Sequence, residues 1–295
     1  MRYQAALRSD PVGASSWHGS DKQGVGRIAG PDVAASMTRI HHERLGSGPP
    51  LLLIHGLGGK ISSWAPVLDA LASRRSLILF DLPGHGRSPA EPDSGTFAGL
   101  VRSVRAFVDE QGLGATDVAG ISLGGRLALE LARQGHGGRC VALDPGGFWE
   151  GWERSWFAST ITASVAMLRL LRPQLPALAG NAVSRSALLA QLSARPWALN
   201  GKTVAEELTS YASTPTFEPL VRDLSTGPAQ QGPAAPDSGA VVIGWGRHDR
   251  LCLARQAARA KAAFPSARLV WFDGSGHFPI WDEPDAAVQV ILGED

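Results

Sequence analysis

The chain has 295 residues, 44% of them hydrophobic and 19% charged, which is an ordinary composition for a soluble globular protein with a sizeable core. Its net charge of +1 gives no electrostatic reason to bind nucleic acid or an acidic membrane surface, so we expect neither as a partner. The two cysteines, Cys140 and Cys252, stand apart without the spacing of metal ligands. We expect both to be buried and reduced, as in a cytoplasmic protein.

Residues 1–36 differ in composition from the rest of the chain. They are rich in Gly, Ser, Ala and Asp, and they contain no sustained apolar run of the kind found in secretory signals. We expect this stretch to be a disordered tail, or to be sequence upstream of a later start at Met37. We also expect no membrane insertion, because the leucine-rich stretch at 167–172 is interrupted by arginines and ends at Pro173.

From Met37 onward, strand patterns alternate with helix patterns. A first strand falls within 38–45, and short apolar runs predict strands that are covered on both faces at 51–54, 77–80, 117–121, 140–143, 241–243 and 268–272. Apolar residues that recur on one face predict helices over 64–71, capped by Ser62 or Ser63, over 97–108, from 123 onward, and over 254–263 and 284–292. This alternation predicts an α/β fold with a mostly parallel sheet and helices on both faces.

The alternation is interrupted between Gly146 and about Pro236. Helical segments fill this region, and a linker rich in Gly, Pro, Ala and Gln ends it. We therefore predict a core formed by 37–146 and 236–295, and a helical cap with its linker over 147–235. Because ligands bind outside the strand ends of open α/β sheets, the cap should cover the binding pocket. Four of its side chains are candidates to line that pocket: Trp149, Trp152, Trp156 and Trp197.

The pentapeptide Gly120-Ile121-Ser122-Leu123-Gly124 connects a predicted strand to a predicted helix. This Gly-x-Ser-x-Gly pattern is typical of a nucleophile elbow, in which the serine lies at the tip of a sharp strand-to-helix turn. The glycines allow neighbouring segments to come close, and the helix N-terminus offers free N–H groups beside the serine. Glycine and serine are common in this chain, so the pattern alone would also fit a structural turn. Its position between a strand and a helix favours a nucleophile.

A nucleophilic serine needs a base, and a histidine base needs an acid that holds its tautomer. Asp249 and His277 follow Ser122 in the chain order that nucleophile elbows use, and each lies in a Gly-rich loop just after a predicted strand. Loops that follow parallel strands open at the same edge of the sheet. Asp144 also ends a predicted strand, and it is therefore the alternative acid.

An oxyanion hole is predicted from His55-Gly56-Leu57-Gly58-Gly59, which follows the strand at 51–54. Glycines there let backbone N–H groups face the acyl oxygen of a bound substrate. The expected donors are the backbone N–H groups of Leu57 and Leu123, which act on charge that develops only in the transition state.

Taken together, these segments resemble the α/β-hydrolase-fold serine hydrolases, in the capped esterase and epoxide-hydrolase-like branch. The resemblance also includes the stretch 81–88 (Asp-Leu-Pro-Gly-His-Gly-Arg-Ser) and the Glu-Pro pair at 283–284. It implies the α/β-hydrolase fold, with Ser122 as nucleophile, Asp249 as acid and His277 as base. Dehalogenases and epoxide hydrolases of this fold carry an aspartate at the elbow, so the serine argues against both. The resemblance identifies no subfamily for the cap.

We therefore expect a serine hydrolase that cleaves a carboxylic ester or similar acyl bond of a small, largely apolar substrate. It should need no metal and no organic cofactor, and both a monomer and a homodimer are compatible with the sequence. Two alternatives use the same triad: carbon–carbon bond hydrolysis of a vinylogous diketone, and cofactor-free perhydrolysis. A third is a ligand-binding protein without catalysis, although such proteins usually lack a triad member. We expect His55 and His85 to shape loops, and His248 to be exposed beside the acid.

Overall fold

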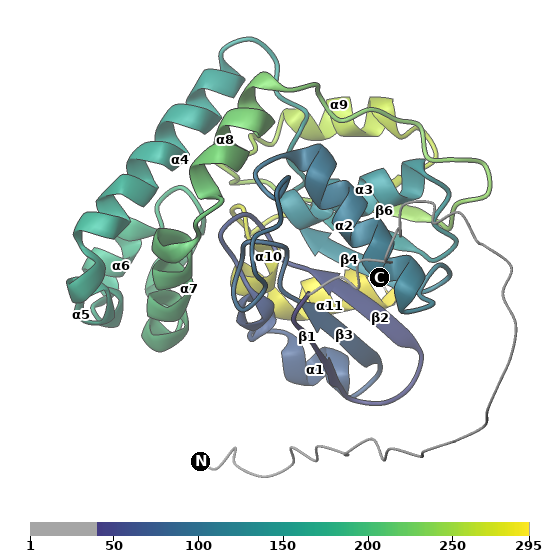
Figure 1. Cartoon of the computed structure of the whole chain (residues 1–295). Helices are drawn as coiled ribbons and strands as arrows, with labels where there is room; N and C mark the ends of the chain where they lie inside the picture. Colours follow the sequence, from purple (N-terminus) through teal and green to yellow (C-terminus); the bar gives the residue numbers. More distant parts are fainter. Residues whose placement is uncertain (1–39, 295) are drawn as a thin grey trace, which may run out of the picture. The chain divides into compact units, whose positions relative to one another are not determined.

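The structure is a computed structural model and describes residues 40–294 (Figure 1). The tail expected over 1–36 lies outside the described residues. Seven strands form one sheet: β1 (His42–Leu45), β2 (Pro50–Ile54), β3 (Ser76–Phe80), β4 (Asp117–Ile121), β5 (Cys140–Leu143), β6 (Val241–Gly246) and β7 (Arg268–Phe272). Their order is β1-β3-β2-β4-β5-β6-β7. Only the β1–β3 pair is antiparallel, so the mostly parallel sheet predicted from the sequence is confirmed.

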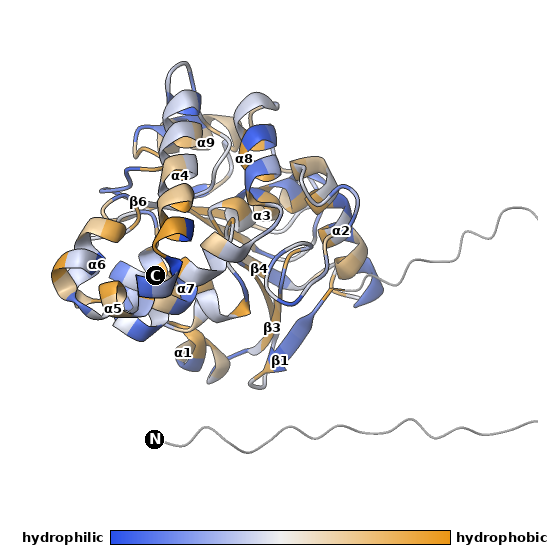
Figure 2. Cartoon of the chain, turned by 60° about the vertical axis from the view of Figure 1, so that its left-hand side comes forward, coloured by the Kyte–Doolittle hydropathy of each residue, from blue (hydrophilic) through white to orange (hydrophobic). Residues whose placement is uncertain are grey.

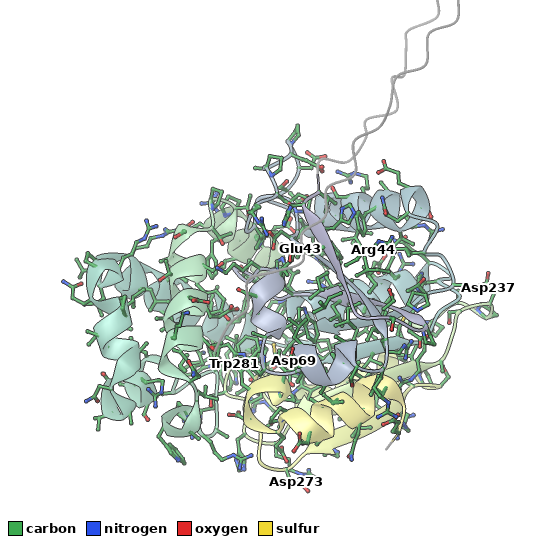
Figure 3. All side chains as sticks on the ribbon, turned by 90° about the horizontal axis from the view of Figure 1, so that it is seen from below. Glu43, Arg44, Asp69, Asp237, Asp273 and Trp281 are labelled. Carbon is green, nitrogen blue, oxygen red and sulfur yellow. The ribbon has the colours of Figure 1, made fainter. Side chains whose placement is uncertain are left out.

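The central strands are buried because their apolar runs face helices on both sides of the sheet. All four residues 51–54 of β2 are fully buried, and β4, β5 and β6 are almost as well covered. β1 is different: its four residues are exposed, and Figure 2 colours this strand as hydrophilic. Figure 3 labels Glu43 and Arg44 on it. Charged side chains on an edge strand discourage pairing with the edge of another sheet.

The helices that alternate with the strands cover both faces of the sheet. They are η1 (Ile61–Trp64), α1 (Leu68–Ala72), α2 (Phe97–Glu110), α3 (Leu123–Arg133), α9 (Gln256–Ala263), α10 (Pro279–Asp282) and α11 (Pro284–Leu292). α1 packs against α11 on one side, and α2 packs against α3 on the other (Figures 1 and 3). The sequence did not predict the short α10.

The helix predicted over 64–71 is wrong in its first half. A 3₁₀ turn, η1, ends at Trp64, and the α-helix begins only at Leu68. Pro66 lies between them; it has no backbone N–H to donate to a helical hydrogen bond, so the helix cannot run through it unbroken. Ser63 therefore does not cap an α-helix; its hydroxyl instead donates a hydrogen bond to Glu207.

A helical insertion, residues 147–235, separates β5 from β6 along the chain. It contains α4 (Glu153–Leu170), η2 (Arg172–Gln174), α5 (Leu175–Gly180), α6 (Ala182–Leu188), η3 (Pro196–Ala198), α7 (Gly201–Ser213) and α8 (Phe217–Thr226). α4 packs along α7 and α8, and α8 also touches α2 (Figure 1). In the part of the chain that is described, no helix has both the length and the apolar character needed to cross a membrane.

α3 crosses β2 and β4 at very close range. A Cβ atom added to Gly120 would lie 2.1 Å from the carbonyl oxygen of Gly124. A Cβ on Gly124 would lie 2.1 Å from the carbonyl oxygen of Ile54. Backbone atoms cannot yield at such distances, so both positions require glycine if the helix is to begin directly after the strand.

We predict that Gly120→Ala lowers the free energy of unfolding by about 1–3 kcal/mol or more, because the added methyl group overlaps backbone atoms. The matched control is Gly114→Ala, since a Cβ there would meet no atom within 4 Å. That variant should stay within about 0.5 kcal/mol of the wild type. Urea unfolding of the three proteins measures the difference, and equal stabilities would contradict the packing argument.

Candidate active site

Ser122 lies at the tip of the turn between β4 and α3. Its backbone has φ 56° and ψ −114°, a conformation that residues other than glycine rarely adopt. The turn is held because the N–H of Ser122 donates to the carbonyl oxygen of Leu143 on β5, at 2.8 Å. Ser122 directly precedes α3, and its side chain lines the cavity.

The side chains of Ser122, His277 and Asp249 form a continuous chain of hydrogen bonds. His277 Nε2 lies 2.9 Å from Ser122 Oγ, and His277 Nδ1 lies 2.8 Å from Asp249 Oδ2. The other carboxylate oxygen, Oδ1, accepts hydrogen bonds from the N–H groups of Leu251 and Cys252 at 2.8 and 2.9 Å. With an ionised Asp249, this network places a proton on Nδ1 and leaves Nε2 free to accept the serine proton.

The two predicted oxyanion donors flank the serine. Leu57 and Leu123 both line the cavity that contains Ser122. Within residues 40–294, neither of their backbone N–H groups donates a hydrogen bond to another protein group. A Cβ on Gly56 would lie 3.3 Å from the Cβ of Ser122, so the loop after β2 comes close to the serine. Two backbone N–H groups without a partner in this part of the chain therefore belong to residues that line the cavity with Ser122.

Two buried histidines, His55 and His85, lie in the loops after β2 and β3. His55 Nδ1 lies 2.8 Å from the carbonyl oxygen of Gly56, and its Nε2 accepts the N–H of Leu82 at 3.0 Å. Burial lowers the pKa of His55 to about 4 and that of His85 to about 3. Both rings are therefore neutral at ordinary pH, and His55 links the loop after β2 to the loop after β3.

The two candidate acids have different partners. Asp144 follows β5 directly, is completely buried, and accepts the N–H of Gly246 at 2.8 Å. Its φ of 44° is a second positive value for a residue other than glycine. Of the two carboxylates, only that of Asp249 is hydrogen-bonded to His277. The neighbouring His248 is exposed, as the sequence suggested.

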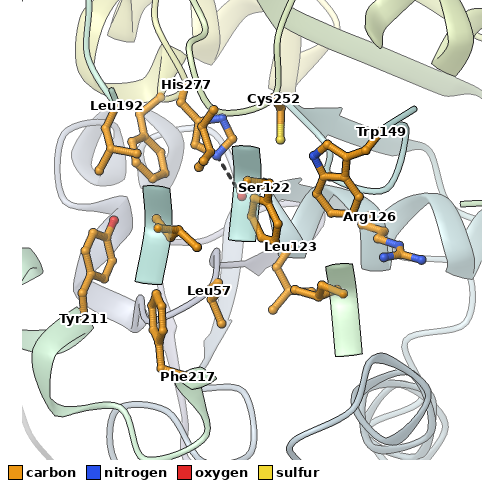
Figure 4. A pocket seen from close by; sticks show the side chains of 16 residues that line it. Leu57, Ser122, Leu123, Arg126, Trp149, Leu192, Tyr211, Phe217, Cys252 and His277 are labelled. Atoms are coloured by element: carbon orange, nitrogen blue, oxygen red, sulfur yellow. Dashed lines mark hydrogen bonds between the residues drawn. The ribbon is translucent and has the colours of Figure 1, made fainter. Parts of the chain in front are cut away.

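The cavity above Ser122 is almost entirely apolar (Figure 4). The insertion supplies one part of its wall, through Phe157 and Ile161 of α4, Tyr211 of α7 and Phe217 of α8. The core supplies the other part, with these side chains among others: Leu57, Leu123, Leu251, Cys252 and Phe278. An apolar wall of this kind favours an apolar group of the substrate.

Of the four tryptophans predicted to line the pocket, the structure places only Trp149 there. It is 4% exposed and stacks on Phe157, with ring centroids 4.6 Å apart. Trp152, Trp156 and Trp197 are 58%, 41% and 59% exposed and lie outside the cavity, which corrects the prediction. The prediction failed because tryptophan content shows that a segment is apolar but not which way each side chain points. Helical spacing within 153–170 could have separated Phe157 and Ile161 from Trp156.

A sequence model of the alpha/beta hydrolase family matches residues 51–290, which includes both the core and the insertion. The chain belongs to this family. The dihydrolipoyllysine-residue acetyltransferase component of the acetoin cleaving system of Cupriavidus necator is 34% identical over 248 residues, 81% of this chain and 62% of that protein. An uncharacterized protein of Mycobacterium tuberculosis is 29% identical over 261 residues, 83% of this chain and 75% of that protein.

Solved structures of other alpha/beta hydrolases share the fold. An esterase from Exiguobacterium antarcticum has a TM-score of 0.68 at 17% identity, over 86% of this chain and 94% of that one. The enol-lactonase from Burkholderia xenovorans has a TM-score of 0.66 at 20% identity, over 86% and 95% of the two chains. At these identities the likeness shows the fold alone. With the family match, it confirms that this alpha/beta hydrolase has the architecture implied by its motifs.

One group of side chains in the described part of this alpha/beta hydrolase has the proximity of metal ligands. Donor atoms of Asp249, Cys252 and His277 lie within 4.8 Å of one another. The group does not suit a metal ion, because Asp249 and His277 are already hydrogen-bonded to each other. Burial also raises the pKa of the Cys252 thiol well above its usual range, which disfavours the thiolate that binds metals.

The insertion is hydrogen-bonded to η1 and to the loop after β2 through α7. The Ser63 hydroxyl donates to the Glu207 carboxylate at 2.7 Å, and the Ser210 hydroxyl donates to the carbonyl oxygen of Gly58 at 2.7 Å. Burial of Glu207 raises its pKa to about 7, although the Ser63 hydrogen bond partly opposes this effect. A carboxyl group that titrates near neutral pH therefore lies between the insertion and the core.

This raised pKa predicts a pH-dependent stability. The folded protein holds a proton on Glu207 up to a pKa of about 7, whereas the ordinary value is 4.5. Glu207 therefore adds to the free energy of unfolding in full below pH 4.5. This contribution, on the order of 3 kcal/mol, is lost as the pH rises through about 7. Glu207→Gln should abolish this loss. The measurement is the free energy of unfolding of wild type and variant between about pH 5 and about pH 8.

The neighbouring Glu206 is exposed, so Glu206→Gln is the matched control and should keep the wild-type pH dependence. The buried histidines titrate equally in all three proteins and cancel in the comparison. Identical pH profiles for Glu207→Gln and the wild type would contradict the assignment.

Proposed function

We propose that this alpha/beta hydrolase is a serine hydrolase that cleaves a carboxylic ester or similar acyl bond of a small, largely apolar substrate. The observation that carries the proposal is the hydrogen-bonded chain Ser122–His277–Asp249 at the floor of an apolar cavity. Serine hydroxyls with this arrangement act as nucleophiles because the histidine accepts their proton as they attack. The insertion that covers the serine acts, in this proposal, as a cap.

The reaction would proceed through an acyl-enzyme. Ser122 Oγ attacks the substrate carbonyl carbon while His277 Nε2 takes its proton, and Asp249 stabilises the imidazolium that forms. The oxygen of the tetrahedral intermediate accepts hydrogen bonds from the N–H groups of Leu57 and Leu123. His277 then protonates the leaving alcohol, and a water molecule releases the acid by the same steps in reverse. The backbone donors are already in place before the negative charge develops, which lowers the barrier.

Carbon–carbon bond hydrolysis is the second use that the same residues allow. The vinylogous diketones that such enzymes cleave yield a dienoate, whose carboxylate would need a cation in the cavity. Apart from His277, Arg126 is the one basic side chain that lines the cavity within residues 40–294. Its guanidinium is engaged elsewhere: it donates to Pro228 and Gln230 and lies over the Phe97 ring. This arrangement favours an uncharged acyl group, and therefore ester cleavage.

Covalent labelling tests the proposal directly. We predict that a fluorophosphonate probe adds to the wild type in one-to-one stoichiometry, because His277 makes Ser122 reactive, and that Ser122→Ala abolishes the addition. Intact-mass spectrometry measures the adduct. A panel of p-nitrophenyl esters of increasing chain length, assayed beside a dienoate-forming substrate, distinguishes the two reactions. Labelling that persists in Ser122→Ala would refute the assignment of the nucleophile.

The cavity wall predicts which substrates are preferred. Trp149→Ala removes an apolar surface that would contact a long acyl or alcohol group. The KM for a long apolar ester should rise by roughly tenfold, which corresponds to about 1.4 kcal/mol, while the KM for an acetate ester should change little. The matched control is Trp197→Ala, because Trp197 is exposed and lies outside the cavity. After circular dichroism has confirmed folding, an unchanged chain-length profile in Trp149→Ala would mean that the insertion does not select the substrate.

A further inference from the structure

The carboxyl group of Asp144 is a buried acid that the proposed mechanism does not use. Its Oδ1 accepts the N–H of Gly246 at 2.8 Å. Its Oδ2 is also buried, and no N–H or O–H group of residues 40–294 donates to it. A buried carboxylate oxygen without a donor is costly, whereas a protonated oxygen can itself donate a hydrogen bond.

An acceptor for such a proton lies next to Asp144. The side chain of Asp249 is within hydrogen-bonding reach of it, and both carboxyl groups are shielded from solvent. Two carboxylates that share a buried site cannot both be ionised, so one of them holds a proton. Asp249 accepts three N–H hydrogen bonds, from His277, Leu251 and Cys252, and all three favour its ionised form. Asp144 accepts only one, so the proton belongs on Asp144.

We propose that Asp144 is a positioning residue that remains neutral and donates a hydrogen bond from Oδ2 to the Asp249 carboxylate. The proposal rests on the proposed function, because it assumes that Asp249 is the acid that holds His277. It goes further because it adds Asp144 as a fourth member of the chain Ser122–His277–Asp249. The sequence alone suggested Asp144 only as an alternative acid.

Two further observations agree with this assignment. Asp144 has a φ of 44°, and its own N–H donates to the carbonyl oxygen of Gly244 at 2.8 Å, so its backbone is fixed by β6. A strained conformation of this kind persists only where the surrounding structure holds it. Burial and the adjacent charge of Asp249 also raise the pKa of Asp144 well above its usual range.

The hydrogen bond would influence His277 through Asp249. A donor that stabilises the Asp249 carboxylate makes it a weaker acceptor for the imidazolium, so His277 stays unprotonated down to a lower pH. The other titratable groups around the pair are Asp282 and the buried Cys252 thiol. Asp282 accepts hydrogen bonds from Gly276, Ala194 and Ser193, so its carboxylate is already satisfied.

The protonation state of Asp144 can be measured without turnover. Asp144→Asn keeps the shape of the side chain and an N–H donor, tolerates a positive φ, and removes the acid. We expect the infrared difference spectrum, wild type minus Asp144→Asn at neutral pH, to contain the carbonyl stretch of one protonated carboxyl group. Glu207 is present in both proteins and cancels. A difference spectrum with carboxylate bands alone would overturn the proposal.

The pH dependence of fluorophosphonate labelling at Ser122 tests the influence on His277. The acid limb is the fall in labelling rate as the pH drops and His277 becomes protonated. If Asp144 is a neutral donor, Asp144→Asn should have the same acid limb as the wild type. If Asp144 were ionised, removing its charge would move the limb to lower pH, which would contradict the proposal. Asp144→Gly, which accepts the positive φ but offers no donor, should move the limb upward by about half a pH unit or more. If the acid limb of Asp144→Gly coincides with that of the wild type, Asp144 does not influence His277 and only fills space.

These outcomes are separable from failure of the proposed function. If Ser122 is not labelled at all, the serine hydrolase assignment fails, while the infrared spectrum still reports whether Asp144 is protonated. If Ser122 is labelled and the protonated band is absent, the hydrolase assignment stands and only the role of Asp144 is lost.

Discussion

The close contact between β4 and α3 is the constraint on which the site depends. Only Ser122 separates the strand from the helix, and the chain can turn this sharply because Gly120 and Gly124 leave no Cβ between the two segments. The turn forces Ser122 into a positive φ, and it aims the N-terminus of α3 at the same point as the serine hydroxyl. The proposed nucleophile and one proposed oxyanion donor are thus brought together by one local packing requirement.

The parallel sheet brings the other residues of the site, Asp144, Asp249 and His277, to the same edge as Ser122. β4, β5 and β6 are neighbours, and β7 lies beside β6, so the loops after these strands open at one edge. Asp144 follows β5, Asp249 follows β6 and His277 follows β7. All three side chains are buried, where charge–dipole interactions are stronger than in water. Burial also explains why only one of two adjacent carboxyl groups can be ionised.

The sequence predicted the strands well, because a strand covered on both faces must be a continuous apolar run bounded by turns. It also indicated that Ser122, His277 and an acid lie at one sheet edge, since their order follows the strand order. It favoured Asp249 as the acid and kept Asp144 as the alternative, because both follow strands and only side-chain direction distinguishes them; the structure pairs Asp249 with His277. Tyr211 and Phe217 were missed for a related reason: the insertion has no sheet register that would indicate which face of each helix points inward.

The insertion packs against the loop after β2, so the proposed substrate pocket and the proposed oxyanion donor share side chains. Tyr211 and Phe217 line the cavity, and the same two rings pack against Gly58, which has a φ of 76° and no room for a side chain. Leu57, the proposed oxyanion donor, is the residue immediately before that glycine. A substitution that reshapes the cavity at α7 or α8 therefore also presses on the loop that holds the donor. For this reason Trp149, on the opposite part of the wall, is the better position at which to alter chain-length preference without moving the oxyanion hole.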